Sequence, residues 1–245
     1  MATTLTTPQG NSALSEAPAA QTQSLESLLR HRHSCRAFLD RPVPRETLMR
    51  VLGLAQLTAS WCNAQPWQVH IASGEPLARF RDAMLAACAS ESPQPDLSFP
   101  GEYPGVYLER RRNCGWSLYE SVGIGKGDRA ASARQARENF RLFGAPQVAI
   151  VTTPAAMGVY GAIDCGAYVS NFMLAAESVG VATIAQAALA SYPDLARQHL
   201  QIEDDRMVVC GISIGYEDRT HPANAFRLGR APLSEVVAWV GDDSA

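Results

Sequence analysis

Among 245 residues there is a single lysine, Lys126, so the other basic residues are arginines. With 21 basic and 24 acidic residues, the formal net charge is −3 and the isoelectric point is near 6.0. Nucleic-acid-binding domains usually have a basic patch and an isoelectric point above about 9, so the composition argues against such a surface. No uncharged apolar run reaches the roughly 18 residues of a membrane span, and a soluble protein is expected.

Several common sequence signals are also missing. The six cysteines never form a CxxC pair, and the five histidines form no HExxH, so no metal site is predicted. Residues 1–23 have neither the basic nor the apolar segment of a secretory signal. We therefore expect free thiols in the cytoplasm, a flexible tail over residues 1–23 and one domain over residues 24–245.

Helical and extended patterns follow one another irregularly. Apolar spacing predicts a short helix over residues 24–32, helices over 44–57 and 76–89, and a long helix over 159–179. It also predicts an interrupted helical pattern over 107–143 and a short helix from Tyr192. Strands are expected over residues 67–71, 147–151, 182–186 and 207–214. Because the order lacks an even βαβ alternation, an α+β fold is favoured. The helix over 159–179 is apolar nearly all round, which places it in the core or in a subunit interface.

One motif suggests a hydrolase. Residues 211–215 match the GxSxG pattern of a serine nucleophile, with Ser213 at its centre. Such a serine needs a helix directly after it, whereas residues 216–222 have turn chemistry. Asp218 and His221 follow in the order of a catalytic triad but lie in one loop. A strand is favoured here, and a nucleophilic Ser213 remains an alternative.

A second candidate site follows the first helix. Residues 32–36 place Arg32, Ser34 and Arg36 within five positions, which suits a phosphate dianion. On charge pattern alone, a solvated helix end is an equal alternative. A second polar cluster, residues 60–67, combines amides and a hydroxyl beside a strand, and amides can recognise the edge of a planar heterocycle. This second cluster favours the binding interpretation.

In this order the two segments resemble the FMN-dependent nitroreductase family. The matching motifs are Arg-x-Ser-x-Arg after the first helix, proline at the start of the second, and Ser-x-x-Asn-x-Gln-Pro-Trp over residues 60–67. Further similarity occurs at residues 144–146, 164, 171, 185–187, 215–216 and 227–230, so the resemblance covers about residues 25–240. The chain departs from the family at Ala59 and Ala185, where proline is common.

The resemblance implies a nitroreductase-like fold, with a central mixed sheet flanked by helices in an intertwined homodimer. FMN would lie at the subunit interface, with part of the loop over residues 60–65 supplied by the other subunit. The turn after residue 185 would present backbone N–H groups to flavin N5. The implied FMN contacts are Arg32, His33, Ser34, Arg36, Ser60, Asn63, Gln65, Gln186, Ala187, Arg227 and Arg230.

The resemblance also implies an activity. NADPH or NADH would reduce FMN by hydride transfer to N5, and a nitroaromatic compound would then be reduced in a ping-pong reaction without a catalytic side chain. Residues 108–119 and 139–146 are similar to members that reduce nitrobenzoates. They suggest a substrate site formed by Arg112, Trp116, Tyr119 and Phe140. Reduction of quinones, enones or free flavin, dehydrogenation, and a non-catalytic flavin-binding module remain alternatives.

Overall fold

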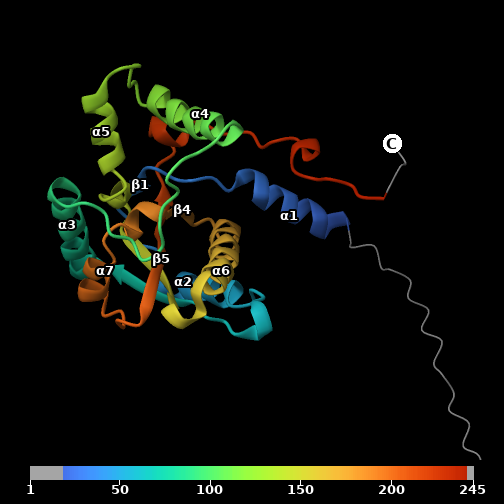
Figure 1. Cartoon of the computed structure of the whole chain (residues 1–245), viewed down its shortest axis with the longest axis horizontal. Coiled ribbons are helices and arrows are strands. Elements are labelled where there is room, and N and C mark those ends of the chain that lie inside the picture. Colours follow the sequence, from blue (N-terminus) through green and yellow to red (C-terminus); the bar gives the residue numbers. More distant parts are fainter. Residues whose placement is uncertain (1–18, 242–245) are drawn as a thin grey trace, which may run out of the picture.

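The computed structural model describes residues 19–241 and shows one sheet with helices on both sides (Figure 1). The helices are α1 (Ala19–His31), α2 (Arg45–Ala55), α3 (Gly74–Ser90), α4 (Val106–Ser121), α5 (Arg129–Arg137), α6 (Gly158–Ser178) and α7 (Pro193–Leu200). The strands are β1 (Phe38–Leu39), β2 (Gln68–Ser73), β3 (Gln147–Pro154), β4 (Ala182–Gln186) and β5 (Arg206–Glu217). Short 3₁₀ turns include η1 (Trp61–Asn63), η4 (Ala187–Ala190), η5 (Pro222–Asn224) and η6 (Leu233–Glu235).

The sheet is built around β5. This strand pairs antiparallel with β1, β3 and β4, and β2 pairs antiparallel with β3. An isolated parallel bridge between Ser34 and Thr183 makes the sheet mixed. The α+β fold and the mixed sheet flanked by helices are thus confirmed.

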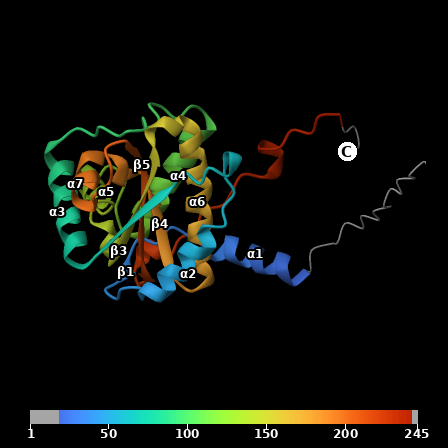
Figure 2. The same ribbon diagram turned by 90° about the horizontal axis from the view of Figure 1, so that it is seen from below.

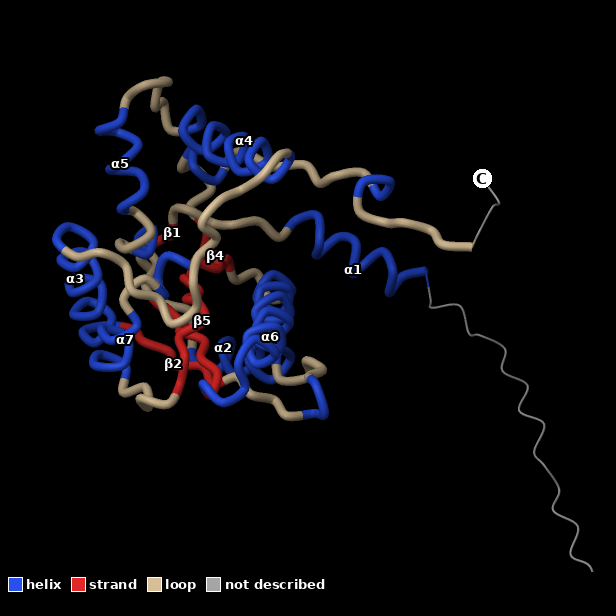
Figure 3. The backbone as a smooth tube through the Cα atoms, in the orientation of Figure 1, coloured by secondary structure: helices blue, strands red, loops and turns tan. Residues whose placement is uncertain are grey.

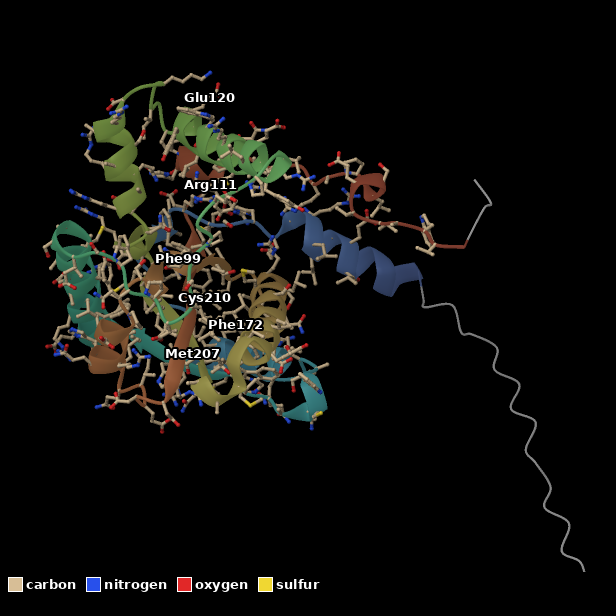
Figure 4. The ribbon with its side chains drawn as sticks, viewed as in Figure 1. Phe99, Arg111, Glu120, Phe172, Met207 and Cys210 are labelled. Atoms are coloured by element: carbon tan, nitrogen blue, oxygen red, sulfur yellow. The ribbon has the colours of Figure 1, made fainter. Side chains whose placement is uncertain are left out.

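Two apolar clusters lie on the two faces of the sheet. Along β3, Ala149 and Val151 face one cluster, and Val148 and Ile150 face the other, as the alternation of a strand requires. The first cluster contains side chains from α2 and α6, and the second contains side chains from α3 and α7 (Figure 2). Figure 4 labels Phe172 of α6, which is fully buried in the first cluster. Because both faces are covered, nearly all of β3 is buried.

Most of the expected elements are present, with differences at their ends. The first helix begins at Ala19, before Ser24, so it enters the range expected to be a tail, and residues 1–18 of that range lie outside the described residues. The interrupted pattern over 107–143 forms α4 and α5, and the joint between them contains Gly123 and Gly127 at positive φ. The two-residue strand β1 is too short to give a periodic signal. Within residues 19–241, no helix combines the length and apolar character needed to cross a membrane.

Candidate functional site

A cavity of about 480 Å³ lies between the end of α1, α4 and the segment after β5. Its volume falls within the roughly 300–1,000 Å³ of small-molecule sites. Figure 3 shows the segment after β5 leaving the sheet near α4 and running out on the same side of the molecule as α1. Six of the residues expected to contact FMN line this cavity together: Arg32, His33, Ser34, Arg36, Arg227 and Arg230.

The chain after α1 is extended, which determines what faces the cavity. The N–H of Cys35 donates to the carbonyl of Thr183 at 3.1 Å, next to the Ser34–Thr183 bridge. Side chains of an extended segment alternate, so Cys35 is fully buried while Ser34 and Arg36 line the cavity. Pairing with the edge of β4 therefore sets the orientation of the predicted phosphate-binding residues.

Four of the five arginines that line the cavity have no anionic partner in the described part of the chain; the exception is Arg30, which pairs with Glu26 at 2.7 Å. Within residues 19–241, no salt bridge involves Arg32, Arg36, Arg227 or Arg230. Arg36 donates to the carbonyl of Ser34 at 3.1 Å, and burial lowers its pKa. Clustered, partly desolvated cations without counter-charges are unfavourable, and a bound anion would relieve this. The cavity is therefore suited to the phosphate of a cofactor such as FMN.

His33 is fixed at the edge of the cavity. Its Nε2 lies 2.8 Å from Oε1 of Glu217, at the end of β5, and its Nδ1 lies 3.0 Å from the carbonyl oxygen of His31. The ring is largely buried, as is the Glu217 side chain. These contacts join the segment after α1 to the end of β5, the central strand of the sheet.

The polar loop over residues 60–65 lies elsewhere. Its backbone is left-handed at Cys62, Asn63 and Gln65, with φ of 51°, 55° and 48°. The Ser60 hydroxyl accepts from the N–H of Gln65 at 2.9 Å. Figure 1 shows this segment, in cyan, near the start of α6, whereas the cavity lies beside α1 and α4. One chain therefore does not bring Ser60, Asn63 and Gln65 to the arginine cavity.

Strain in this loop is itself informative. Left-handed conformations at residues other than glycine cost on the order of 1 kcal/mol or more each, and they cluster at functional sites. The N–H of Trp61 donates to Oδ1 of Asp164 at 3.2 Å, and the rings of Trp61 and Tyr160 lie edge to face at 4.2 Å. The loop is thus held against the first turns of α6 in a specific shape.

Gln186 ends β4, and its side chain is used within the fold. Nε2 donates to the carbonyl of Asn139 at 2.9 Å, and Oε1 accepts from the Ser213 hydroxyl at 2.5 Å. Ala187, the next residue, is exposed, as is Ala185. In the described part of the chain, β4 has no strand partner on its outer edge after Thr183. The turn is thus anchored from inside and accessible from outside.

The hydrolase alternative is wrong. Ser213 is fully buried within β5, which continues to Glu217 instead of turning into a helix. The Asp218 carboxylate accepts from the N–H and hydroxyl of Thr220, and Nδ1 of His221 accepts from the N–H of Ala223. None of these contacts forms a triad.

The residues suggested for substrate binding are separated in the structure. Arg112 is exposed on α4 and has no ion pair within residues 19–241. Trp116 lies edge-on to Tyr119, with their centroids 5.8 Å apart, and Lys126 Nζ lies 5.8 Å from the Trp116 ring. Phe140 instead packs against the second core cluster, 6.0 Å from Tyr192. Only the α4 residues remain close to one another.

Six residues that line the cavity were not among the predicted FMN contacts: Leu29, Arg30, Cys114, Phe226, Leu228 and Gly229. Cys114 reaches the cavity from α4, and Phe226 lies 5.4 Å below the Arg36 guanidinium group. Cys114 lies within the segment 108–119 and Phe226 directly precedes the motif at 227–230, but neither was predicted to line the cavity, because that depends on contacts between segments far apart in the chain.

Comparison with known proteins supports the resemblance. The model of the Nitroreductase family matches residues 29–216. The chain is 37% identical over 218 residues to nitroreductase NfnB of Mycolicibacterium smegmatis, covering 89% of this chain and 93% of that protein. It is 31% identical to the 4-nitrobenzoate reductase of Pseudomonas putida, covering 91% of this chain and 98% of that protein.

The fold comparison agrees. The crystal structure of FMN-dependent nitroreductase NfnB from Mycobacterium smegmatis in complex with NADPH matches with a TM-score of 0.85 at 36% identity. The match covers 90% of this chain and 99% of that chain. The motifs, the arrangement of the sheet and the extent of these matches lead to one conclusion: the chain belongs to the nitroreductase family.

Proposed function

We propose that this protein binds FMN, takes electrons from NADPH or NADH, and reduces nitroaromatic compounds, including nitrobenzoates. The observation that carries the proposal is the cavity in which Arg32, Arg36, Arg227 and Arg230 meet without carboxylate partners among residues 19–241. The relatives named as nitroreductase and 4-nitrobenzoate reductase, and the solved FMN-dependent relative with NADPH, supply the chemical class.

The chain's own residues would act by binding and orientation. Arginine forks suit a phosphate, and Arg36 and Arg230 approach the cavity from opposite ends of the chain. When bound, FMN supplies the hydride and electron transfer, so the protein needs no nucleophile. The exposed edge at Ala185 and Ala187 leaves room for a planar ring, while Gln186 holds the turn through Asn139 and Ser213.

We further propose that the working unit is a homodimer. On α6, Val159, Tyr160 and Ile163 are 66%, 52% and 58% exposed, although the opposite side of this helix is in the core. Covering these side chains with a second copy would remove apolar surface from water. The separation of the loop over residues 60–65 from the arginine cavity supports a site in which each subunit supplies one part. Light scattering after size-exclusion chromatography would test this, since a monomer of 26.4 kDa would contradict it.

A cytoplasmic location is also proposed. All six cysteines are free thiols, and Cys35 and Cys165 are buried in the core. Free thiols are typical of a reducing compartment. Fractionation of the producing cells would test it, and recovery of the protein outside the cytoplasm would contradict it.

One spectroscopic experiment tests the central proposal. Purified protein reconstituted with FMN is expected to be yellow and to bleach anaerobically with NADPH or NADH. Its colour should return on adding 4-nitrobenzoate. Failure to retain FMN would contradict the proposal, and a yellow protein that never bleaches would favour the non-catalytic flavin-binding module.

A comparison of turnover rates would identify the preferred electron acceptor. Steady-state rates with 4-nitrobenzoate, nitrobenzene, a quinone, an enone and free FMN would rank the possible reactions. A rate with the enone or free FMN far above the nitroaromatic rates would replace the proposed reaction with another flavin reaction on the same fold.

A further inference from the structure

Asn224 lies in η5, directly behind the arginine cavity, and its side chain is almost fully buried at 4% exposure. Its Oδ1 accepts from the N–H of Arg36 at 2.7 Å. Its Nδ2 donates to the carbonyls of Ala37 and Asp218, both at 2.9 Å. Both amide protons and the carbonyl oxygen are therefore used, and the orientation of the amide is determined by its partners.

The backbone of the same residue reaches the other side of the cavity. Its carbonyl accepts from Nη1 of Arg227 at 2.7 Å, and its N–H donates to the carbonyl of His221 at 3.0 Å. Two chain segments thus meet at one residue: the segment after α1, which carries Arg36, and the segment after β5, which carries Arg227. These segments are separated by 188 positions at the Arg36–Asn224 bond.

We propose that Asn224 is a positioning residue for the phosphate of the cofactor, because it holds the two arginine-bearing segments at a fixed spacing before the cofactor binds. The inference rests on the proposed FMN function, and it concerns a residue that does not line the cavity itself.

Preorganisation explains why a residue outside the cavity affects affinity. Arginine side chains lose conformational entropy when they are ordered around an anion, and a site ordered in advance loses less on binding. Arg227 would keep its bond to the backbone carbonyl of residue 224, but without the amide the segment that carries Arg36 would lose its bonds to this residue. The spacing between the two arginines would then no longer be fixed, and their N–H groups would converge less well on a phosphate. The isoalloxazine and ribityl parts of the cofactor would keep their own contacts, so the effect is expected on the phosphate alone.

The test compares FMN with riboflavin, which has the same ring and ribityl chain but no phosphate. Dissociation constants of both are measured with the full-length apoprotein by quenching of flavin fluorescence, for the wild type and for Asn224→Ala. We expect the variant to raise the Kd for FMN about tenfold or more, as loss of preorganised charged hydrogen bonds implies. The Kd for riboflavin is expected to change less than about threefold.

Gln147 provides a matched control. It is another buried side-chain amide, at 6% exposure, and it bonds both the N–H and the carbonyl of Val43, at 2.8 and 3.1 Å. Gln147 does not line the arginine cavity. Gln147→Ala should lower the Tm to a similar degree while leaving the ratio of the two dissociation constants unchanged. A purely structural role for Asn224 would give the same pattern in both variants.

The outcomes separate this inference from the proposed function. If the wild type binds FMN and folded Asn224→Ala keeps the wild-type ratio, the inference fails and the proposed function stands. If the wild type does not bind FMN, the proposed function fails and the inference falls with it. Asn224→Ser gives the same comparison should the alanine variant not fold, and if neither variant folds, Asn224 is a general structural residue and the inference is contradicted.

Discussion

Ser213 sits in the middle of β5, where its hydroxyl donates to Oε1 of Gln186. Ser213→Ala removes the donor and leaves a buried amide oxygen without this partner, which costs about 1–3 kcal/mol. We therefore expect the Ser213→Ala variant to have a lower free energy of unfolding, measured in urea. Its FMN should still be reduced by NADPH or NADH.

The control for this change is an exposed serine with a local bond. Ser90 donates to the carbonyl of Ala86 in the same helix, so Ser90→Ala should alter the free energy of unfolding by less than about 0.5 kcal/mol. Labelling of the wild type by a serine-directed phosphonate, with loss of the label in Ser213→Ala, would restore the hydrolase interpretation.

Gly211 lies opposite Gln186 in the ladder between β4 and β5. A Cβ placed on Gly211 would overlap the side chain of Leu189 and come within 3.0 Å of Cδ1 of Ile150. Leu189 is fully buried in the turn after β4, so it cannot move into solvent. Gly211→Ala is expected to lower the free energy of unfolding by about 1–3 kcal/mol.

Gly53 in α2 offers the matched substitution. A Cβ there meets nothing within 4 Å, and alanine is the better helix former by about 1 kcal/mol. Gly53→Ala should therefore stabilise the protein or leave it unchanged in the same urea titration. Equal effects of the two substitutions would show that overlap with Leu189 is not the cause.

At the scale of elements, periodic patterns predicted most of the fold. The apolar run of β3 and the small apolar residues of α6 are local signals, and both elements form where expected. The cluster over residues 32–36 was predicted as a phosphate site from the chemistry of arginine and serine, taken together with the second polar cluster and the family resemblance. Such signals need no knowledge of distant contacts.

Other parts of the site were inaccessible to that reasoning. Nothing near Asn224 in the sequence indicates that its amide meets the N–H of Arg36. The partner of Arg110 is Glu235, at 2.6 Å but 125 positions away. Phe140 follows a helical pattern, yet tertiary packing places it, partly buried, against the second core cluster beside Tyr192. These features depend on which segments meet, and a single sequence does not contain that information in local form.

The arginines of α4 differ in what they are free to bind. Arg110 is paired with Glu235, and the Arg111 guanidinium lies 5.1 Å over the Tyr103 ring, whereas Arg112 has neither kind of partner within residues 19–241 (Figure 4 labels Arg111). A substrate carboxylate would therefore meet Arg112 first. Arg112→Gln is expected to raise the KM for 4-nitrobenzoate about two- to fivefold, as for an exposed ion pair, and to leave that for neutral nitrobenzene unchanged.

Arg110→Gln is the control on the same helix. Because its guanidinium group is already paired, it should produce no selective change between the two substrates. If Arg112→Gln raises the KM for both substrates equally, or if Arg110→Gln is the variant that selectively raises the KM for 4-nitrobenzoate, the assignment of Arg112 to the carboxylate is wrong.

At the scale of the whole molecule, the burial of cysteine thiols makes the free energy of unfolding vary with pH in the alkaline range. Burial raises the pKa of the Cys35 and Cys165 thiols from 9.0 to about 12. Between these values the native thiols keep their protons while those of the unfolded chain ionise, so the stabilisation is complete below pH 9 and declines as pH rises toward 12. The free energy of unfolding should fall by up to about 1.4 kcal/mol per thiol for each pH unit above 9.

Urea titrations at pH 8, 9 and 10 would measure this decline. Cys165→Ala should reduce the slope above pH 9, although it also lowers stability at every pH by removing buried volume. Cys62 is exposed, and Cys62→Ser should leave the slope unchanged. A free energy of unfolding that is constant from pH 8 to pH 10 would contradict the assignment of neutral buried thiols.

The arrangement of two subunits can be tested through the two separated parts of the site. The arginine cavity lies beside α1 and α4, and the loop over residues 60–65 is held against the start of α6 by Asp164. If each FMN site combines the cavity of one subunit with the loop of the other, a dimer has two such sites. If a cavity defect is placed in one subunit and a loop defect in the other, shared sites would combine both defects in a single site. Sites built within one subunit would instead contain one defect each.

A mixed dimer distinguishes these arrangements. One subunit carries Arg36→Glu, which puts a carboxylate in the cavity, and the other carries Ser60→Ala, Asn63→Ala and Gln65→Ala in the loop. Each homodimer should bind FMN poorly, because every site has one defect. In a mixed dimer with sites shared between subunits, both defects meet in one site and the other site is intact, so about one FMN should bind per dimer with wild-type affinity. If each site is instead built within one subunit, both sites of the mixed dimer contain a defect, and equilibrium dialysis would show no tight binding.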